Sequence, residues 1–129
     1  MNVLLDTHLI LWIFNGEGEN QISANAQTIL DDLSCKLFVS IASAWEVALK
    51  ISIGKLKFPH GVRGFIQVLI ENNIHILGIA PQYLQAVETL PFYHRDPFDR
   101  LLIATAQVEN IPIISADEYF SLYDVSVIW

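Results

Sequence analysis

Two aspartates follow short apolar runs that have the composition of buried strands. Asp6 comes directly after NVLL, and Asp117 follows IPIIS with one alanine between. In a parallel sheet both carboxylates would lie beyond the carboxyl ends of strands, where ligands of α/β proteins gather. Aspartate also caps helices and favours turns, so either residue taken alone has an ordinary structural explanation.

Two further acids occur in helical patterns that would bury them. Glu46 lies within SIASAWEVALKIS, where apolar neighbours predict a largely buried helix. An ionised carboxylate there requires a partner or a metal ion. The alternative is that Glu46 lies on a narrow exposed stripe and pairs with Lys50 at i+4. Asp99 shares a helix face with Leu102 and Ile103, so we expect it to point towards the apolar side.

Four carboxylates at one sheet edge would repel one another, and burial together with like charge would raise their pKa values. A divalent cation removes this conflict. The four histidines show no paired metal-ligand spacing, and the single cysteine, Cys35, stands alone. Oxygen ligands therefore predominate, and they favour Mg²⁺ or Mn²⁺ over zinc or copper. The chemistry that such a site suggests is metal-assisted phosphodiester hydrolysis.

The elements that would position these acids alternate along the chain. The residue pattern predicts strands over 2–5, 37–40, 74–77, 111–115 and 125–129 and helices over 7–14, 23–33, 42–53, 62–71, 81–89 and 97–109, with a short helix between the last two strands. Asp96 as N-cap and Pro97 at the first helical position make a favourable start for the helix that carries Asp99. The alternation predicts an α/β fold, with a central parallel sheet of about five strands and helices on both faces.

Length and composition predict one domain, residues 1–129, without a membrane segment. The chain is 53% hydrophobic, against roughly 45 to 50% in typical soluble domains, which indicates a dense core, a partner surface or both. Its apolar stretches are interrupted well short of the roughly 20 residues of a membrane span, and the start MNVLLDTH lacks the features of a signal peptide. One cysteine cannot form an internal disulfide, so a reduced, cytoplasmic compartment is expected.

The charge balance argues against a protein that grips nucleic acid through bulk positive charge. The chain has 7 Lys and Arg residues against 14 Asp and Glu residues, a net charge of −7. Its cations are nevertheless close to the candidate acids in sequence. Lys50, Arg95 and Arg100 are candidates for contacts with phosphate, although surface ion pairs would account for them equally well.

The order of short motifs resembles a known family. LLDTH, SAWEVALK, HRDPFDRLLIATA, ISADEYF and a terminal SVIW resemble, over essentially the full chain, the PIN-domain ribonucleases and in particular the VapC-type toxins of bacterial toxin–antitoxin pairs. The resemblance implies that Asp6, Glu46, Asp99 and Asp117 form a catalytic acidic quartet that binds Mg²⁺ or Mn²⁺. Asp96, in the same HRDPFDR variant, could assist. It further implies endonucleolytic cleavage of RNA, a homodimer, and silencing by a cognate antitoxin.

The expected mechanism follows from the metal. Asp6 and Asp99 would hold the principal ion, and hydrolysis would leave a 3′-hydroxyl and a 5′-phosphate. Thr7 and Ser115 could hydrogen-bond the acidic ligands, although hydroxyls are also ordinary at caps and strand ends.

An apolar group offers a candidate surface for a second copy of the chain or for the antitoxin. Its members lie on the first helix and near the end of the helix that carries Glu46: Leu11, Trp12, Phe14, Ile51 and Ile53. Aromatic residues at helical spacing are more often part of the core.

Three other functions share parts of this pattern. A phosphorelay receiver is also a small α/β chain with aspartates at strand ends, but Thr7 and His8 rather than a second acid follow Asp6, and no lysine follows Lys57. A non-catalytic PIN-like interaction module would keep the fold, and the presence of all four acids argues against it. A DNA nuclease of the same fold is the nearer alternative, because no residue pattern here reads a 2′-hydroxyl.

Overall fold

Five parallel strands form the centre of the computed structural model, which describes residues 1–16 and 21–129. Their order across the sheet is β3-β2-β1-β4-β5. The strands are β1 (Asn2–Leu5), β2 (Lys36–Ser40), β3 (His75–Leu77), β4 (Ile113–Ile114) and β5 (Val127–Ile128).

The strand order reverses beside β1. The chain builds outwards from β1 to β2 and β3, then returns to the other side of β1 to add β4 and β5. Leu4 is consequently paired with Phe38 of β2 on one side and with Ile113 of β4 on the other. A crevice beyond the carboxyl ends of β1 and β4 is the place where such sheets bind ligands.

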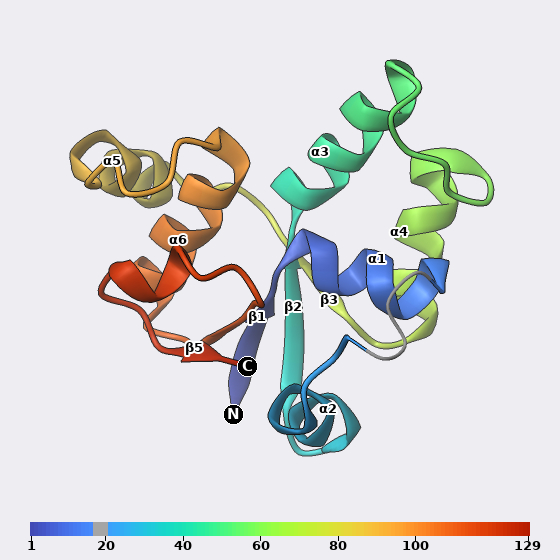
Figure 1. The fold of residues 1–129 in the computed structure, drawn as a ribbon, viewed down its shortest axis with the longest axis horizontal. Helices are drawn as coiled ribbons and strands as arrows, with labels where there is room; N and C mark the ends of the chain where they lie inside the picture. The colour runs from blue at the N-terminus through green and yellow to red at the C-terminus, as the bar shows by residue number, and fades with distance from the viewer. Residues whose placement is uncertain (17–20) are drawn as a thin grey trace.

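Helices cover both faces of the sheet, which confirms the predicted fold class (Figure 1). In Figure 1, α1 and α4 lie on one side of the strands, and α5 and α6 lie on the other. The helices are α1 (Thr7–Asn15), α2 (Ala24–Asp31), α3 (Ile41–Ser52), α4 (Gly61–Glu71), α5 (Pro81–Thr89) and α6 (Pro97–Glu109), with a 3-10 turn η1 (Phe120–Leu122) before β5. None of these helices has the length and apolar character needed to cross a membrane.

Every predicted element is present, but β4 and β5 are shorter than predicted. Pro112 has no N–H to donate, so only its carbonyl joins the ladder, accepting from Leu4 N at 2.9 Å. Beyond β4, Ser115 N still donates to Ile128 O, at 3.2 Å. The strand pairing therefore continues to the residues that precede Asp117.

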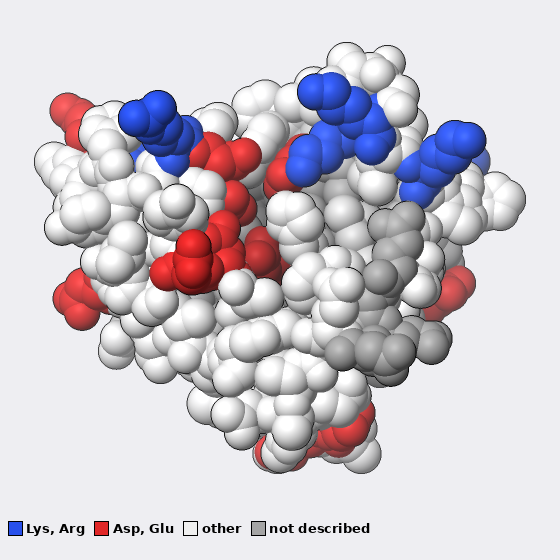
Figure 2. Space-filling model, in the orientation of Figure 1, with Lys and Arg blue, Asp and Glu red and all other residues white. Residues whose placement is uncertain are grey.

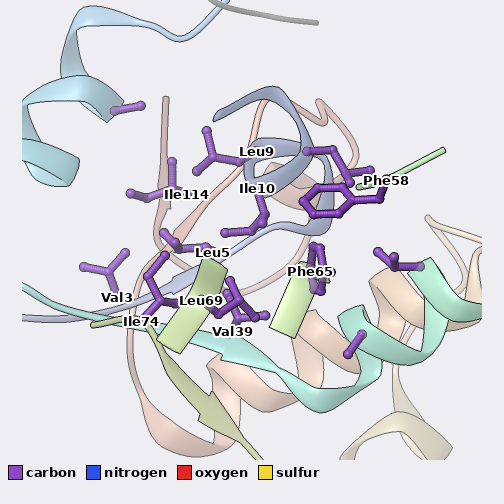
Figure 3. Packing of buried hydrophobic residues seen from close by; sticks show 14 residues of the cluster. Val3, Leu5, Leu9, Ile10, Val39, Phe58, Phe65, Leu69, Ile74 and Ile114 are labelled. Atoms are coloured by element: carbon purple, nitrogen blue, oxygen red, sulfur yellow. The ribbon is translucent and has the colours of Figure 1, made fainter. Parts of the chain in front are cut away.

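The residues of β1 are buried on both faces because successive side chains of a strand point in opposite directions. Val3 and Leu5 join a cluster with α1, α3 and α4, whereas Leu4 packs with α6 in a second cluster. Figure 3 shows the first cluster, in which Phe65 and Leu69 of α4 face the sheet. Two apolar layers thus fix β1, and with it the position of Asp6.

Two side-chain caps set where the helices of the predicted site begin. Ser40 Oγ accepts from Ala42 N at 3.0 Å and starts α3, which carries Glu46. Asp96 Oδ1 accepts from Phe98 N at 2.8 Å and from Asp99 N at 3.1 Å at the start of α6. The predicted cap of α6 is confirmed.

The predicted apolar docking surface is mostly core. Leu11 is buried, Phe14 and Ile51 are half-buried against the first cluster, and Trp12 is half-buried. The Trp12 ring packs on that of Trp129, with the centroids 5.8 Å apart. Of the five residues only Ile53 is exposed. Burial excludes Leu11 from such a surface, whereas a docking role for the half-buried and exposed side chains stays a prediction.

Candidate active site

Asp6 is the innermost acid at the carboxyl edge of the sheet. It follows β1 directly, and its N–H donates to Ile114 O at 3.1 Å, which ties it to β4. Ser115 Oγ donates to Asp6 Oδ2 at 2.8 Å, and Oδ1 is buried without a hydrogen-bond partner among the described residues. Burial raises the pKa of Asp6, although Ser115 and His8 act in the opposite direction.

Asp99 stands on the first turn of α6 and is 7% exposed. Burial is the main cause that raises its pKa to about 8, and the charges of Asp6, Asp96, Glu46 and Asp117 add to the shift. The structure thus places the four predicted acids near enough for their charges to act on one another. Without a compensating cation, Asp99 would bind a proton at neutral pH.

Glu46 is buried on α3, yet it also has a partner. Its Oε2 accepts from Lys50 Nζ at 2.8 Å, while Oε1 is buried without a partner among the described residues. Ser43, which would share an exposed stripe with Glu46, is buried too. The i+4 pair therefore forms, but the exposed stripe does not exist.

His94 connects two of the acids, and sequence reasoning missed it. Its Nε2 lies 2.8 Å from Asp117 Oδ2 and 3.1 Å from Asp99 Oδ2. Its Nδ1 accepts from Asp96 N at 3.1 Å, which assigns the ring proton to Nε2 and makes that nitrogen the donor to the carboxylates. The available signal was its place in the loop that leads into α6, two residues before the cap.

Asp117, which follows β4, is held in place by hydrogen bonds of its backbone N–H and of its side chain. Its N–H donates to Ser115 Oγ at 3.0 Å, and its Oδ1 accepts from Tyr119 N at 2.9 Å. Oδ2 faces His94. Ser115 therefore positions both Asp6 and Asp117, by donating to the side chain of the first and accepting from the backbone of the second.

The donor set fits a divalent cation. Asp6 and Glu46 each direct one buried oxygen without a described partner, and carboxylate oxygens are the ligands of Mg²⁺ and Mn²⁺. Ligand atoms of His94, Asp99 and Asp117 lie within 4.8 Å of one another. A cation bound near these groups would compensate their clustered negative charge.

Of two predicted accessory roles, that of Thr7 differs from the structure and that of Asp96 as a ligand stays a prediction. Thr7 was expected to hydrogen-bond an acid, but its hydroxyl donates to Ser43 Oγ at 2.7 Å. Asp96 was considered as a further ligand, and its Oδ1 accepts the two N–H groups at the start of α6. Its charge nevertheless acts on Asp99.

Arg100 was predicted to contact phosphate, and this is wrong. The residue is 5% exposed, and its guanidinium donates to backbone carbonyls of the end of α5 and of the loop before α6. The acceptors are Pro91 O at 2.7 Å, Leu90 O at 3.0 Å, Val87 O at 3.3 Å and His94 O at 3.4 Å. A guanidinium with these acceptors fixes the loop and is not free to bind a ligand.

The surface around the site is hollowed and carries both signs of charge. A cavity of about 240 Å³ opens over Asp6 and Asp117 and is bordered by His8, Leu9, Trp12 and Ala116. Figure 2 shows acidic side chains gathered in a central hollow, with basic side chains on both upper rims. Arg95 is exposed beside the site, and the side chain of Lys50 is 38% exposed.

Comparisons with known proteins agree with this architecture. A comparison with curated proteins gives no match. Among solved structures, the chain is similar to VapBC2 from Rickettsia felis bound to a DNA fragment from their promoter, with a TM-score of 0.74 and 13% identity over 98% of this chain and 97% of that chain. VapBC-1 from nontypeable Haemophilus influenzae gives a TM-score of 0.68 and 16% identity over 98% of this chain and 96% of that chain.

A toxin-antitoxin complex from Klebsiella pneumoniae is also similar, with a TM-score of 0.63 and 15% identity over 98% of this chain and 96% of that chain. At these identities the likeness establishes the fold. Sequence adds a match to the model of the PIN domain family, and the match covers residues 3–125, from β1 to the residue that precedes β5 by two positions. With that match over nearly the whole chain, the protein belongs to the PIN domain family.

Proposed function

We propose that this chain is a metal-dependent endoribonuclease of the VapC toxin type. The observation that supports the proposal is that the charges of Asp6, Glu46 and Asp117 all act on the buried Asp99, and that Asp6 and Glu46 each have a buried carboxylate oxygen without a described partner. Membership of the PIN domain family supports nuclease chemistry at this edge. The similar VapBC structures and the Klebsiella toxin-antitoxin complex support the toxin type.

The four acids would hold Mg²⁺ or Mn²⁺ in this proposal. Bound there, the ion supplies Lewis acidity that activates water and offsets the charge of the phosphodiester. Ser115 keeps Asp6 and Asp117 in place through hydrogen bonds of 2.8 and 3.0 Å. His94 Nε2 lies within hydrogen-bonding distance of both Asp99 and Asp117 and would orient these two carboxylates.

The proposed substrate is RNA, and the charge distribution indicates modest affinity. A net charge of −7 leaves only local cations to attract phosphate. Arg95 is exposed at the site, and Lys50 is shared between Glu46 and solvent. Sequence preference would then depend on RNA shape or on an exposed single strand.

The proposed partners are a cognate antitoxin and a second copy of the chain, both in the cytoplasm. The similar solved structures include a toxin-antitoxin complex, which supports the first of these. Co-expression with the protein encoded beside this one, followed by size-exclusion chromatography with light scattering, tests both. We expect a stable complex that lacks nuclease activity, and a homodimer of the free chain.

Cleavage of RNA by the purified chain tests the activity. We expect cleavage in Mg²⁺ or Mn²⁺, none in EDTA, and none of DNA with the same sequence. Asp6→Asn should abolish it, whereas Asp124→Asn, an exposed acid beside β5, should behave as wild type. Cleavage that persists in EDTA, or equal activity of the two variants, would contradict the proposal.

A further inference from the structure

A second hollow adjoins the acidic site and is lined by aromatic rings. We call it the aromatic hollow; it has a volume of about 490 Å³ and is lined by Phe92, Tyr93, His94, Arg95, Asp96 and Tyr119. Five of these residues belong to the loop between α5 and α6. The sixth follows β4, close behind Asp117.

The rings of the aromatic hollow are unusually exposed. Every Phe, Trp and Tyr of the chain lies in the described part, and only four of them are exposed. Three of the four line this hollow: Phe92 is 78% exposed, Tyr93 52% and Tyr119 48%. Large apolar side chains gathered on a surface mark a binding site.

The exposed rings are nevertheless held in place from behind. Tyr93 packs edge-on against Tyr123, with centroids 5.2 Å apart. The Tyr123 hydroxyl donates to Pro91 O at 2.6 Å and accepts from His94 N at 2.8 Å. The loop therefore has a fixed path, which lowers the entropy that the rings lose when they bind a ligand.

Arg100 gives the same loop a second support. Its guanidinium lies 3.9 Å from the centroid of the Phe92 ring while it donates to the loop carbonyls. A buried cation thus holds one face of Phe92 and leaves the remainder of the ring to solvent. Rigid aromatic surfaces of this kind bind flat ligands at low entropic cost.

His94 forms a wall common to the aromatic hollow and the acidic site. Its ring packs on that of Tyr119 with centroids 5.5 Å apart, and its Nε2 faces Asp99 and Asp117. Asp117 in turn accepts from Tyr119 N. A ligand that extends across His94 would therefore contact both the carboxylates and the aromatic rings.

We propose that the aromatic hollow stacks a nucleobase of single-stranded RNA beside the phosphate that is cut. This inference rests on the proposed nuclease function. A base can stack on exposed rings only when it has left its own helix, so the hollow selects unpaired RNA. Arg95, exposed on the rim, supplies a cation for the adjoining phosphate.

Abasic substitution in the RNA tests the inference with the unmodified protein. A short single-stranded RNA that the wild type cuts at one mapped bond is remade with an abasic ribose at each position near that bond in turn. We expect one abasic position to reduce kcat/KM by about fivefold to 100-fold, which corresponds to the loss of one stacked base. Equal cleavage of all these RNAs would overturn the subsite.

Variants of the rings tie that effect to the aromatic hollow. Tyr93→Ala and Tyr119→Ala should reduce kcat/KM on intact RNA by about fivefold or more each, whereas Tyr93→Phe and Tyr119→Phe keep the rings and should keep the activity. Trp45→Ala, which removes the exposed ring outside the hollow, is the matched control. Circular dichroism melting curves check that each variant is folded.

The combined experiment separates the two levels of the proposal. If Tyr93 or Tyr119 stacks the base directly, the abasic effect disappears in the corresponding alanine variant, because the same contact cannot be lost twice. If cleavage depends on metal but the effects of the abasic substitution and of the alanine substitution add fully, the proposal that the aromatic hollow binds a base is overturned. The proposed nuclease function then still stands. Failure to cut any RNA overturns both.

Discussion

Asp99 and Arg100 are neighbours on α6, are both buried, and differ in how their charges are compensated. Arg100 donates to four backbone carbonyls. Asp99 has a single neighbouring donor, His94 Nε2 at 3.1 Å, and otherwise faces acids, so that burial and their charge raise its pKa to about 8. A buried charge is therefore informative only together with its partners. A compensated one stabilises a loop, and an uncompensated one marks a place for a ligand.

Removal of the Arg100 guanidinium should have the largest effect on stability. We expect Arg100→Met to lower the free energy of unfolding by about 3 kcal/mol or more, because several buried carbonyls lose their donor at once. Urea denaturation measures this. Arg95→Met, the exposed neighbour, should stay within about 0.5 kcal/mol of wild type. Similar denaturation curves for the two variants would contradict the structural role of Arg100.

The neighbouring acid should give the opposite result. We expect Asp99→Asn to reduce RNA cleavage by at least about 100-fold, roughly 2.7 kcal/mol in transition-state stabilisation, since loss of a ligand should exceed the effect of losing a group that only orients one. The metal-free variant should be as stable as wild type or more stable, because the neutral amide does not have to take up a proton on folding, as the buried Asp99 carboxylate does. If the Asp99→Asn variant cut RNA as the wild type does and had a lower free energy of unfolding, Asp99 would have a structural role, as Arg100 has.

The dependence of stability on pH should distinguish the two charges further. The folded state holds a proton on Asp99 up to about pH 8, whereas the unfolded chain loses it near its ordinary value of 3.8. The folded state therefore binds more protons in this window, so the metal-free protein should lose about 2 kcal/mol of stability between pH 6 and pH 8. Urea denaturation across this range measures it.

Asp99→Asn should flatten this profile, and so should millimolar Mg²⁺, which binds the folded state and also raises its stability. A metal-free wild type whose stability rises towards pH 8 would contradict the raised pKa of Asp99.

The hydroxyl groups of Ser115 and Thr7 allow the same comparison between a residue of the site and a structural residue, with the smallest expected effects. Ser115 donates to Asp6, whereas Thr7 donates to Ser43. Ser115→Ala and Thr7→Val should each lower stability by about 1 kcal/mol, the usual cost of one lost hydrogen bond. Only Ser115→Ala should also weaken Mn²⁺ binding, by about tenfold. Titration calorimetry measures the affinity, and an equal change in both variants would refute the distinction.

Local sequence patterns were sufficient to predict most of the fold. Alternating apolar runs predicted the strands, and Asp96 with Pro97 predicted the start of α6. The ends of β4 were less predictable because they depend on pairing with β1 and β5 across the sheet, where Pro112 lacks a donor.

Candidate site residues could be predicted from the sequence where the residue pattern buries a charged side chain. Glu46 stands among apolar neighbours, and the structure buries it while also forming the pair with Lys50. His94 was missed because its partners Asp99 and Asp117 meet it only through the folded loop. Arg100 was misjudged because its partners are backbone carbonyls, which leave no trace in residue types.

The hydrogen bond between Ser115 and Asp6 joins residues 109 positions apart. During translation Asp6 is made before its partner, because Ser115 and Asp117 emerge only after α1 to α6 have been synthesised. Ribosomes that stall or chains that are cut before Ser115 yield fragments without the completed acidic edge. If the proposed nuclease function holds, the order of synthesis would confine it to molecules that contain the residues up to Asp117.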